Sequence, residues 1–222
     1  MNFKLDVNYL DVLIKEAQTP TDDPIKKTIQ MGLQSSCSIY CKSNNKQWSG
    51  SGFHVGNGLI ITAGHVVPLD EAITEINITF DNQKFLPAKF IASNPDIDTG
   101  AVYSESAASF PKLDFGNSDS LELGDIVVVI GSPEGFHDTA TVGRVSNIHQ
   151  TLGSQAPSKA WQDIIFIDAD ILEGSSGGMV LGLDGTVYGI VMGVTGQHSD
   201  IGVGENSISP SNKIKDFIAK LV

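Results

Sequence analysis

The sequence predicts an all-β protein, built as antiparallel barrels or a sandwich, with helical segments only at its two ends. Its apolar runs are short, Gly, Asn, Asp and Pro separate them, and almost no helix-length pattern falls between them. Closely spaced strands with such turn signals are typical of antiparallel barrels and sandwiches. The 222 residues, 41% of them hydrophobic, suffice for one large β-rich domain or two small lobes.

The N-terminal segment, residues 1–35, is polar and is expected to be helical. It contains YLDVLIKEA and then TPTDDPIKKTIQMGL, in which Asp22 or Asp23 can cap a helix that Pro24 opens. Two roles fit this acidic segment: a docking or regulatory arm, or a helix packed on the β-structure.

Two series of short β-branched or aromatic runs follow. The first contains CSIYCKS, SGFHV, GLIITAG, AITEINITF, FLPAKFIAS and TGAVYS, and the second GDIVVVIGSP, TATVGRVSNI, DIIFIDADI, GGMVLG and TVYGIVMGV. FPKLDFGNSDSLELG is the predicted crossover between them, and Asp184-Gly185 predicts a hairpin turn. SPSNKIKDFIAKLV predicts a closing helix, capped by Ser211 or Asn212, with an apolar face of Ile214, Phe217, Ile218 and Leu221.

Charge argues against nucleic-acid and membrane partners. The chain has 14 basic and 26 acidic residues, a formal net charge of −12, so its surface repels phosphate backbones and anionic lipid and mildly favours basic peptides. The first residues lack a secretory signal, and no apolar run is long enough to span a bilayer, so we expect a cytoplasmic protein. Cys37 and Cys41 lie too far apart in a strand to bridge, which predicts buried thiols rather than a disulfide or a metal site.

The stretch EGSSGGMV lies between two apolar runs and places two serines among three glycines, more glycine than a plain loop needs. Its glycines allow the N–H groups of Gly174 and Ser176 to point into one small hole beside the Ser176 hydroxyl. Such a hole stabilises the oxyanion of an acyl-transfer intermediate. Ser176 is therefore a candidate nucleophile if the chain also supplies a base and an acid.

His65 is the candidate base, because it stands where an apolar strand ends and the chain must turn. Asp98 immediately precedes a strand of small and apolar residues, and an imidazole N–H would satisfy its partly buried carboxylate. Asp96, two residues earlier, competes for this role. The other histidines suit structural or exposed positions: His54 in a strand, and His137, His149 and His198 in turns or loops.

These motifs together resemble the trypsin-like serine proteases of the HtrA/Deg branch. The ordered set is SGSGFHVGNGLIITAGHVV, DIDTGAV, GDIVVVIGSPEG, IDADILEGSSGGMVLGLDGTVYGI and SISPSNKIKDFI, and the resemblance runs from about residue 28 to the end. It implies two antiparallel six-stranded β-barrels, flanked here by the N-terminal helical segment and the C-terminal helix. Residues 36–113 would form the first barrel, with His65 and Asp98, and residues 114–222 the second, with Ser176 and the closing helix.

The resemblance implies a serine endopeptidase that acts on proteins or peptides through an acyl-enzyme, with no metal or organic cofactor. Position by position, His65, Asp98 and Ser176 match the catalytic triad, and Gly174 matches the oxyanion-hole glycine, with Ser176 N–H as the second donor. The chain departs from the pattern at Ser175, where the branch has Asn and animal trypsins have Asp, so activation by a new N-terminal salt bridge is not expected. Two smaller departures are Met179, where the branch usually has Pro, and Gly100, where it usually has Ala. We expect no peptide-binding PDZ module after the closing helix.

Substrate preference is predicted from Asp170, six residues before Ser176. This position resembles the floor of the trypsin specificity pocket, where a carboxylate selects Arg or Lys. The alternative is an Asp170 that faces solvent or a buried donor, beside a small apolar pocket. Asp168 matches an acidic position for which a structural role is expected, and Val191, Met192 and Gly193 suit the edge that pairs with substrate as an added strand.

Two other functions also fit parts of the sequence. GSSGG also fits the nucleophile elbow of α/β-hydrolases, but that fold needs alternating helices and a histidine after the acid, and only His198 follows Ser176. The second is a protease-fold binding module, or one gated by a regulatory protein partner, with an intact triad and a latent site.

Overall fold

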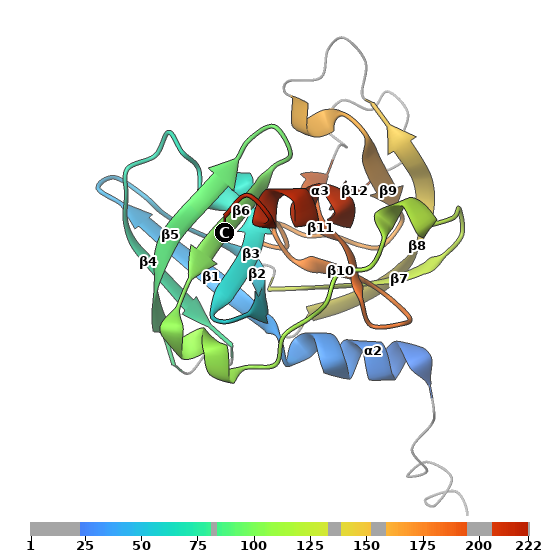
Figure 1. Cartoon of the computed structure of the whole chain (residues 1–222), viewed down its shortest axis with the longest axis horizontal. Coiled ribbons are helices and arrows are strands. Elements are labelled where there is room, and N and C mark those ends of the chain that lie inside the picture. Colours follow the sequence, from blue (N-terminus) through green and yellow to red (C-terminus); the bar gives the residue numbers. More distant parts are fainter. Residues whose placement is uncertain (1–22, 81–83, 133–138, 152–158, 195–205, 222) are drawn as a thin grey trace, which may run out of the picture.

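Two closed six-stranded antiparallel barrels make up the computed structural model, which describes residues 23–80, 84–132, 139–151, 159–194 and 206–221. The all-β prediction with two barrels and a helix at each end is confirmed, and the sandwich alternative is not (Figure 1). YLDVLIKEA, His137 and His198 lie outside the described residues.

The first barrel has the strand order β1-β2-β3-β6-β5-β4. Its strands are β1 Ser36–Ser43, β2 Gln47–Gly56, β3 Leu59–Ala63, β4 Ile73–Thr79, β5 Leu86–Asn94 and β6 Thr99–Tyr103. Cys37 and Cys41 are free and buried inside it, with Ile39 between them, and burial raises the pKa of Cys41 to about 12. Both thiols are therefore packing residues, as predicted.

The second barrel has the order β10-β11-β12-β9-β8-β7. Its strands are β7 Ile126–Gly131, β8 Thr139–Gln150, β9 Ile164–Ile167, β10 Met179–Gly182, β11 Val187–Val194 and β12 Asn206–Pro210. Strand β7 is apolar on both faces: Val127 and Val129 fill the barrel, whereas Val128 and Ile130 join the core outside it. The predicted Asp184-Gly185 turn joins β10 to β11, and Gly185 has a φ of +78° there.

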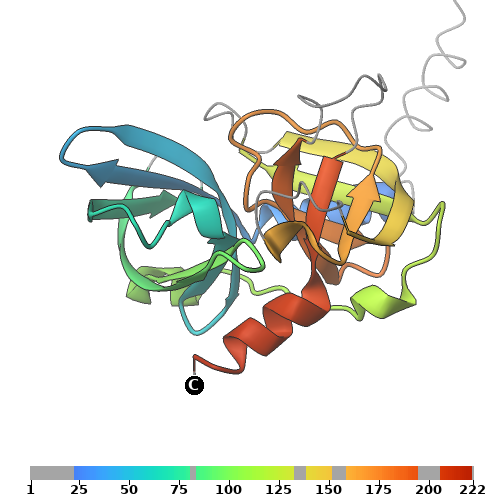
Figure 2. The same cartoon turned by 90° about the horizontal axis from the view of Figure 1, so that it is seen from above.

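The two helices pack on this outer core. Helix α2, Pro24–Leu33, begins at Asp23, whose Oδ1 accepts a hydrogen bond from Ile25 N–H at 2.9 Å, and its apolar residues Ile25, Ile29 and Leu33 face the core. Helix α3, Ser211–Ile218, crosses from the second barrel toward the first (Figure 2).

The predicted cap of α3 is wrong, because Pro210 occupies the cap position, and the first-turn N–H of Asn212 donates instead to the Ser118 hydroxyl at 3.2 Å. The Ser211 hydroxyl donates instead to the carbonyl of Gly116 at 3.0 Å, so it fixes α3 to the crossover segment. The predicted apolar face does pack inward, with Ile214 and Phe217 buried.

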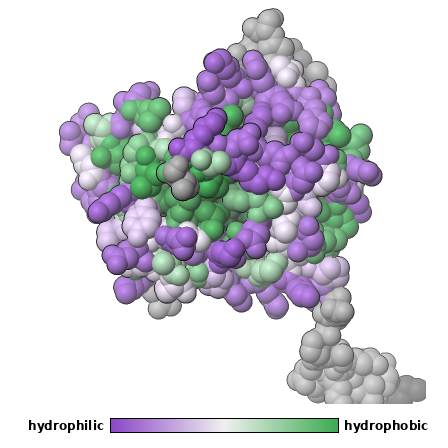
Figure 3. All heavy atoms as spheres, in the orientation of Figure 1, coloured by the Kyte–Doolittle hydropathy of each residue, from purple (hydrophilic) through white to green (hydrophobic). Residues whose placement is uncertain are grey.

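The surface is mixed. Figure 3 shows apolar areas interrupted by polar ones, and the exposed large apolar residues include Phe85, Phe90 and Ile91, on or beside β5. Among the described residues, no helix has the length and apolar character needed to cross a membrane.

Candidate active site

His65 lies in a single 3-10 turn, Gly64–Val66, at the end of β3, and we call this segment the His turn. Side chains from other elements hold its backbone. His65 N–H donates to Asp98 Oδ1 at 2.9 Å, Ser93 Oγ donates to the Gly64 carbonyl at 3.2 Å, and the Val66 carbonyl accepts from Trp48 Nε1 at 2.9 Å and from Cys41 Sγ at 3.5 Å. The ring is therefore presented from a fixed backbone although the side chain itself is half exposed.

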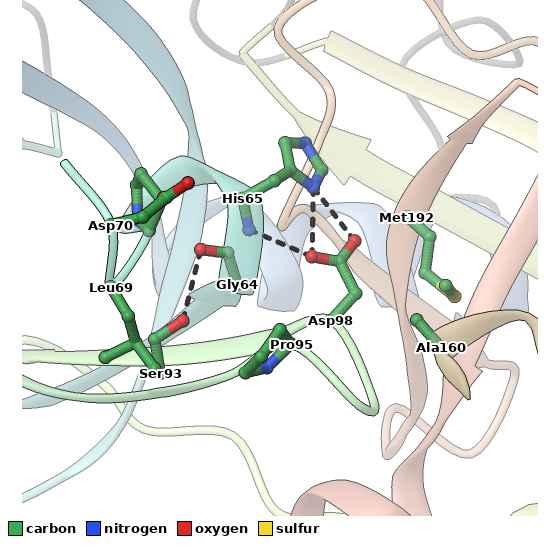
Figure 4. A pocket seen from close by; sticks show the side chains of 10 residues that line it. Gly64, His65, Leu69, Asp70, Ser93, Pro95, Asp98, Ala160 and Met192 are labelled. Carbon is green, nitrogen blue, oxygen red and sulfur yellow. Dashed lines mark hydrogen bonds and ion pairs between the residues drawn. The ribbon is translucent and has the colours of Figure 1, made fainter. Parts of the chain in front are cut away.

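His65 and Asp98 form a close pair. The ring nitrogen Nδ1 lies 2.8 Å from Asp98 Oδ2 and 3.1 Å from Oδ1, and Figure 4 shows the carboxylate below the ring. Because the carboxylate occupies Nδ1, the hydrogen bond selects the tautomer that leaves Nε2 free to accept a proton.

The pair also changes the acidity of the ring. Burial acts to lower the pKa of His65, but the hydrogen bond to Asp98 and the negative charge of that carboxylate together outweigh it. The net result is a His65 pKa above its usual value.

Asp98, and not Asp96, contacts the histidine. Asp98 has a φ of +46°, a left-handed conformation that Asp tolerates better than most residues, and the conformation places its carboxylate under the His turn. Asp96 is exposed, and its Oδ2 accepts from Lys159 Nζ at 3.1 Å.

Ser176 follows a tight turn of residues 172–175 that we call the oxyanion turn. Ser175 N–H donates to the Leu172 carbonyl at 3.0 Å, and Gly174, the third residue, has a φ of +91°. A positive φ at this place defines a type II turn and requires Gly or Asn. Among the described residues, neither Gly174 N–H nor Ser176 N–H has a hydrogen-bond acceptor.

Strand β2 of the first barrel brings the oxyanion turn beside the His turn. The Ser176 carbonyl accepts from Ser51 N–H at 2.8 Å. A Cβ on the neighbouring Gly50 would lie 2.6 Å from Val66 Cγ2 and 3.2 Å from the Ser176 carbonyl oxygen, so both turns pack against the same glycine. Within the described ranges no hydrogen bond joins Ser176 Oγ to His65.

A pocket of about 580 Å³ opens beside His65, between the barrels. Met192 and Ala160 of the second barrel lie across it from the His turn (Figure 4). Its walls are Gly64, His65, Pro68, Leu69, Asp70, Ser93, Pro95, Asp98, Ala160 and Met192.

Of the four predicted substrate-binding residues, Met192 lines this pocket and the other three do not. Asp170 is exposed and does not line this pocket. The Val191 side chain is buried in the second barrel, Met192 lines the pocket, and a Cβ on Gly193 would meet open space. On one edge of β11, the pairing with β10 extends only as far as Ile190. On that edge, residues 192–193 have no paired strand in the described part of the chain.

The remaining polar candidates have structural partners. Asp168 Oδ1 accepts from Arg144 N–H, which fits the expected structural role. His54 is buried, and its ring nitrogens bond the Pro111 carbonyl and Gly58 N–H. In the described part of the chain, no group of three or more His, Cys, Asp or Glu side chains could hold a metal ion.

The model of the trypsin-like peptidase domain family matches residues 50–190, and the chain belongs to that family. A probable periplasmic serine endoprotease, DegP-like, of Chlamydia pneumoniae is 39% identical over 158 residues, which are 70% of this chain and 31% of that protein. Human serine protease HTRA4 is 34% identical over 174 residues, 78% of this chain and 35% of that protein. The chain thus spans about a third of the length of these relatives.

Solved structures share the fold. The HtrA-type protease AlgW with a bound tripeptide has a TM-score of 0.77 at 20% identity, covering 89% of this chain and 63% of that one. The Rv3671c protease of M. tuberculosis in its active form has a TM-score of 0.74 at 23% identity, covering 87% of this chain and 83% of that one. The HtrA-type resemblance predicted from the motifs is therefore confirmed by the DegP-like relatives and HTRA4, and the solved structures confirm the fold.

The predicted cytoplasmic location is wrong. Relatives from Chlamydia and Pseudomonas are named periplasmic endoproteases, which points to a periplasmic or extracellular location. The prediction depended on the first residues, and an exported chain whose leader has been removed carries no such signal either.

Proposed function

We propose that this chain is a serine endopeptidase in which Ser176 is the nucleophile, His65 the general base and Asp98 the residue that orients His65. The pairing of His65 Nδ1 with both Asp98 oxygens, at 2.8 and 3.1 Å, carries this proposal. The serine endoprotease names of the DegP-like relatives and of HTRA4 support it.

In the acylation step His65 Nε2 takes the proton of Ser176 Oγ as that oxygen bonds to the substrate carbonyl carbon. His65 then returns the proton to the leaving amine as the peptide C–N bond breaks, which leaves an ester on Ser176. Water then attacks the ester carbonyl carbon as the same nitrogen takes its proton, and His65 returns that proton to Ser176 Oγ as the acyl C–Oγ bond breaks, which releases the carboxylic acid product and restores Ser176. Asp98 remains ionised and stabilises the imidazolium throughout.

The oxyanion donors are the N–H groups of Gly174 and Ser176. Both lack an acceptor among the described residues, and a positive φ at Gly174 gives the turn its type II form. A donor of this kind contributes on the order of 10²–10³ in rate.

The substrate is a protein or peptide that adds a strand to β11. The unpaired edge at Met192 and Gly193 lies beside the pocket and offers backbone groups for this pairing. Cleavage after Arg or Lys remains part of the proposal, because the exposed Asp170 carboxylate has no cationic partner in the described ranges.

Two experiments test the activity and the preference. Purified protein should degrade fluorescently labelled casein, and Ser176→Ala should abolish this. A peptide library should then show cuts after Arg or Lys that Asp170→Ala removes. Cleavage after Ala or Val, unchanged in Asp170→Ala, would rule out the basic preference and leave the peptidase intact.

A partner-gated module is the second candidate, favoured by the missing hydrogen bond between Ser176 Oγ and His65. Catalytic hydrogen bonds are often long in the absence of substrate, so the missing hydrogen bond alone does not distinguish a gated module from an active peptidase. A gated protein would degrade casein only after a peptide or protein partner is added, whereas the peptidase needs no addition.

A further inference from the structure

Ser51, in β2 of the first barrel, makes hydrogen bonds to the oxyanion turn of the second barrel and to Ser176, which follows that turn. It is fully buried, and its backbone N–H donates to the Ser176 carbonyl at 2.8 Å. Its hydroxyl donates to the Gly174 carbonyl at 2.7 Å and accepts from Ser132 N–H at 2.8 Å. One residue therefore bonds to both residues whose N–H groups are the proposed oxyanion donors.

The hydroxyl of Ser51 has a defined direction. A serine hydroxyl carries one hydrogen and two lone pairs. Because Ser132 N–H points at the oxygen, one lone pair is occupied, and the hydrogen is directed to the Gly174 carbonyl. Thr62 Oγ1 adds a bond to the Ser51 carbonyl at 2.7 Å, so every hydrogen-bonding group of Ser51 has a partner.

The oxyanion turn has little packing of its own. The side chains of Leu172 and Glu173 are exposed, and Gly174 has none. Type I and type II turns differ by a flip of the central peptide, which here joins Glu173 to Gly174 and carries the Gly174 N–H. Glycine accepts either sign of φ, so Gly174 itself does not fix the observed value of +91°.

We propose that Ser51 is a positioning residue that anchors the oxyanion turn at the Gly174 carbonyl and so keeps the Gly174 N–H directed into the oxyanion hole. The proposal rests on the proposed peptidase function. Ser51 acts through Gly174 and does not touch the substrate.

The test compares Ser51→Ala with Thr62→Val. Both residues are fully buried, and each variant removes a buried hydroxyl. Ser51→Ala loses the bonds to the Gly174 carbonyl and from Ser132 N–H, whereas Thr62→Val loses only the bond to the Ser51 carbonyl, so only the Ser51 variant loses a bond to the oxyanion turn. With p-nitrophenyl acetate as the substrate, Ser51→Ala should lower kcat at least about 10-fold at an unchanged KM. Thr62→Val should keep kcat within about 2-fold although it also lowers Tm.

A second measurement does not depend on catalysis. In a Ser176→Ala background, NMR hydrogen exchange at Ser175 N–H, which bonds to the Leu172 carbonyl in the turn, should be about 10-fold faster with Ser51→Ala. Thr62→Val should leave this exchange rate unchanged. If Ser51→Ala does not fold, Ser51→Cys replaces it in both measurements, because a thiol is a much weaker donor.

The outcomes separate the two proposals. Faster exchange at Ser175 with Ser51→Ala alone supports the positioning role even if the wild-type protein hydrolyses nothing, a result that would end the peptidase proposal. Equal exchange rates in the Ser51 and Thr62 variants overturn the positioning role. A fall in kcat of the same size in both variants overturns it too, because Ser51 would then only join the barrels.

Discussion

At the scale of single residues, the proposed catalysis depends on the pairing of His65 with Asp98. Asp98 accepts from both the ring and the backbone N–H of His65, so one carboxylate sets the tautomer of the ring and the position of the His turn. Asp96, two residues away, does neither and pairs with Lys159. Replacing each of these two aspartates by Asn therefore gives a matched pair of variants.

Asp98→Asn should lower kcat by about 10⁴-fold, because the amide favours the wrong histidine tautomer. Asp96→Asn removes a carboxylate from the same loop but should change kcat less than about 2-fold, since exposed ion pairs contribute little. Steady-state peptide hydrolysis measures both. Equal losses in the two variants would contradict the assignment of Asp98.

The raised pKa of His65 predicts a pH profile. The base must be neutral, so kcat/KM should rise with pH, with a midpoint above about 6.5, the ordinary histidine value. Asp98→Asn should move the midpoint of the residual activity to lower pH, because it removes the charge that favours the imidazolium. If the midpoint of the rise in wild-type kcat/KM fell below about pH 6.5, that result would contradict the proposed role of the His65–Asp98 pair.

The same shift affects stability in a defined direction. A histidine whose pKa is raised on folding stabilises the protein below its unfolded pKa, and this contribution is lost as pH rises through the folded pKa. Since the side chain is half exposed, the effect is expected to be small.

At the scale of elements, the contact between the Ser176 loop and the β2–β3 hairpin brings the two barrels together. Gly177 has a φ of +83°, and a Cβ there would lie 2.3 Å from Thr62 Oγ1 and 2.4 Å from the Ser51 carbonyl oxygen. Only a glycine allows this approach.

Gly177→Ala should therefore lower the free energy of unfolding by about 2–5 kcal/mol, from backbone strain and overpacking together. Gly124→Ala is the control, because Gly124 has a similar φ of +91° with open space at its Cβ, and should cost only about 1–2 kcal/mol. Urea denaturation measures both. If both variants lose the same amount, the close approach at Gly177 is not what the interface requires.

The elements also show what the sequence can predict. Alternating apolar residues and turn signals predicted the strands, and the Asp184-Gly185 turn and the buried face of α3 followed from local patterns. The cap of α3 was wrong, because Ser211 bonds to Gly116, a partner 95 residues away. Spacing alone left Asp96 and Asp98 as alternatives, since the choice depends on the left-handed backbone at Asp98.

Ser51 was missed as a functional residue for the same reason. Ser51 lies in a segment that predicted only a strand and the family resemblance, and its hydrogen bonds to Gly174 and Ser176 span more than 120 residues. Such contacts depend on how the two folded barrels pack against each other, which a local sequence pattern does not predict.

At the scale of the whole molecule, the net charge of −12 should influence encounter with substrate. For a Lys-rich peptide, kcat/KM should fall as salt rises from about 0.01 to 0.5 M, because screening shortens the range of attraction. A neutral peptide with the same cleavage site should show little change. An equal fall for both peptides would assign the effect to the enzyme's stability rather than to its charge.

The most direct test of the central claim is labelling with a fluorophosphonate, located by mass spectrometry of the peptides. The two-barrel arrangement with Ser176 activated by His65 predicts a single modified residue, Ser176, and loss of labelling in His65→Ala. It also predicts that a neighbouring buried hydroxyl such as Ser175 stays unmodified. Labelling at any other serine, or Ser176 labelling that persists at the full rate in His65→Ala, would contradict the account.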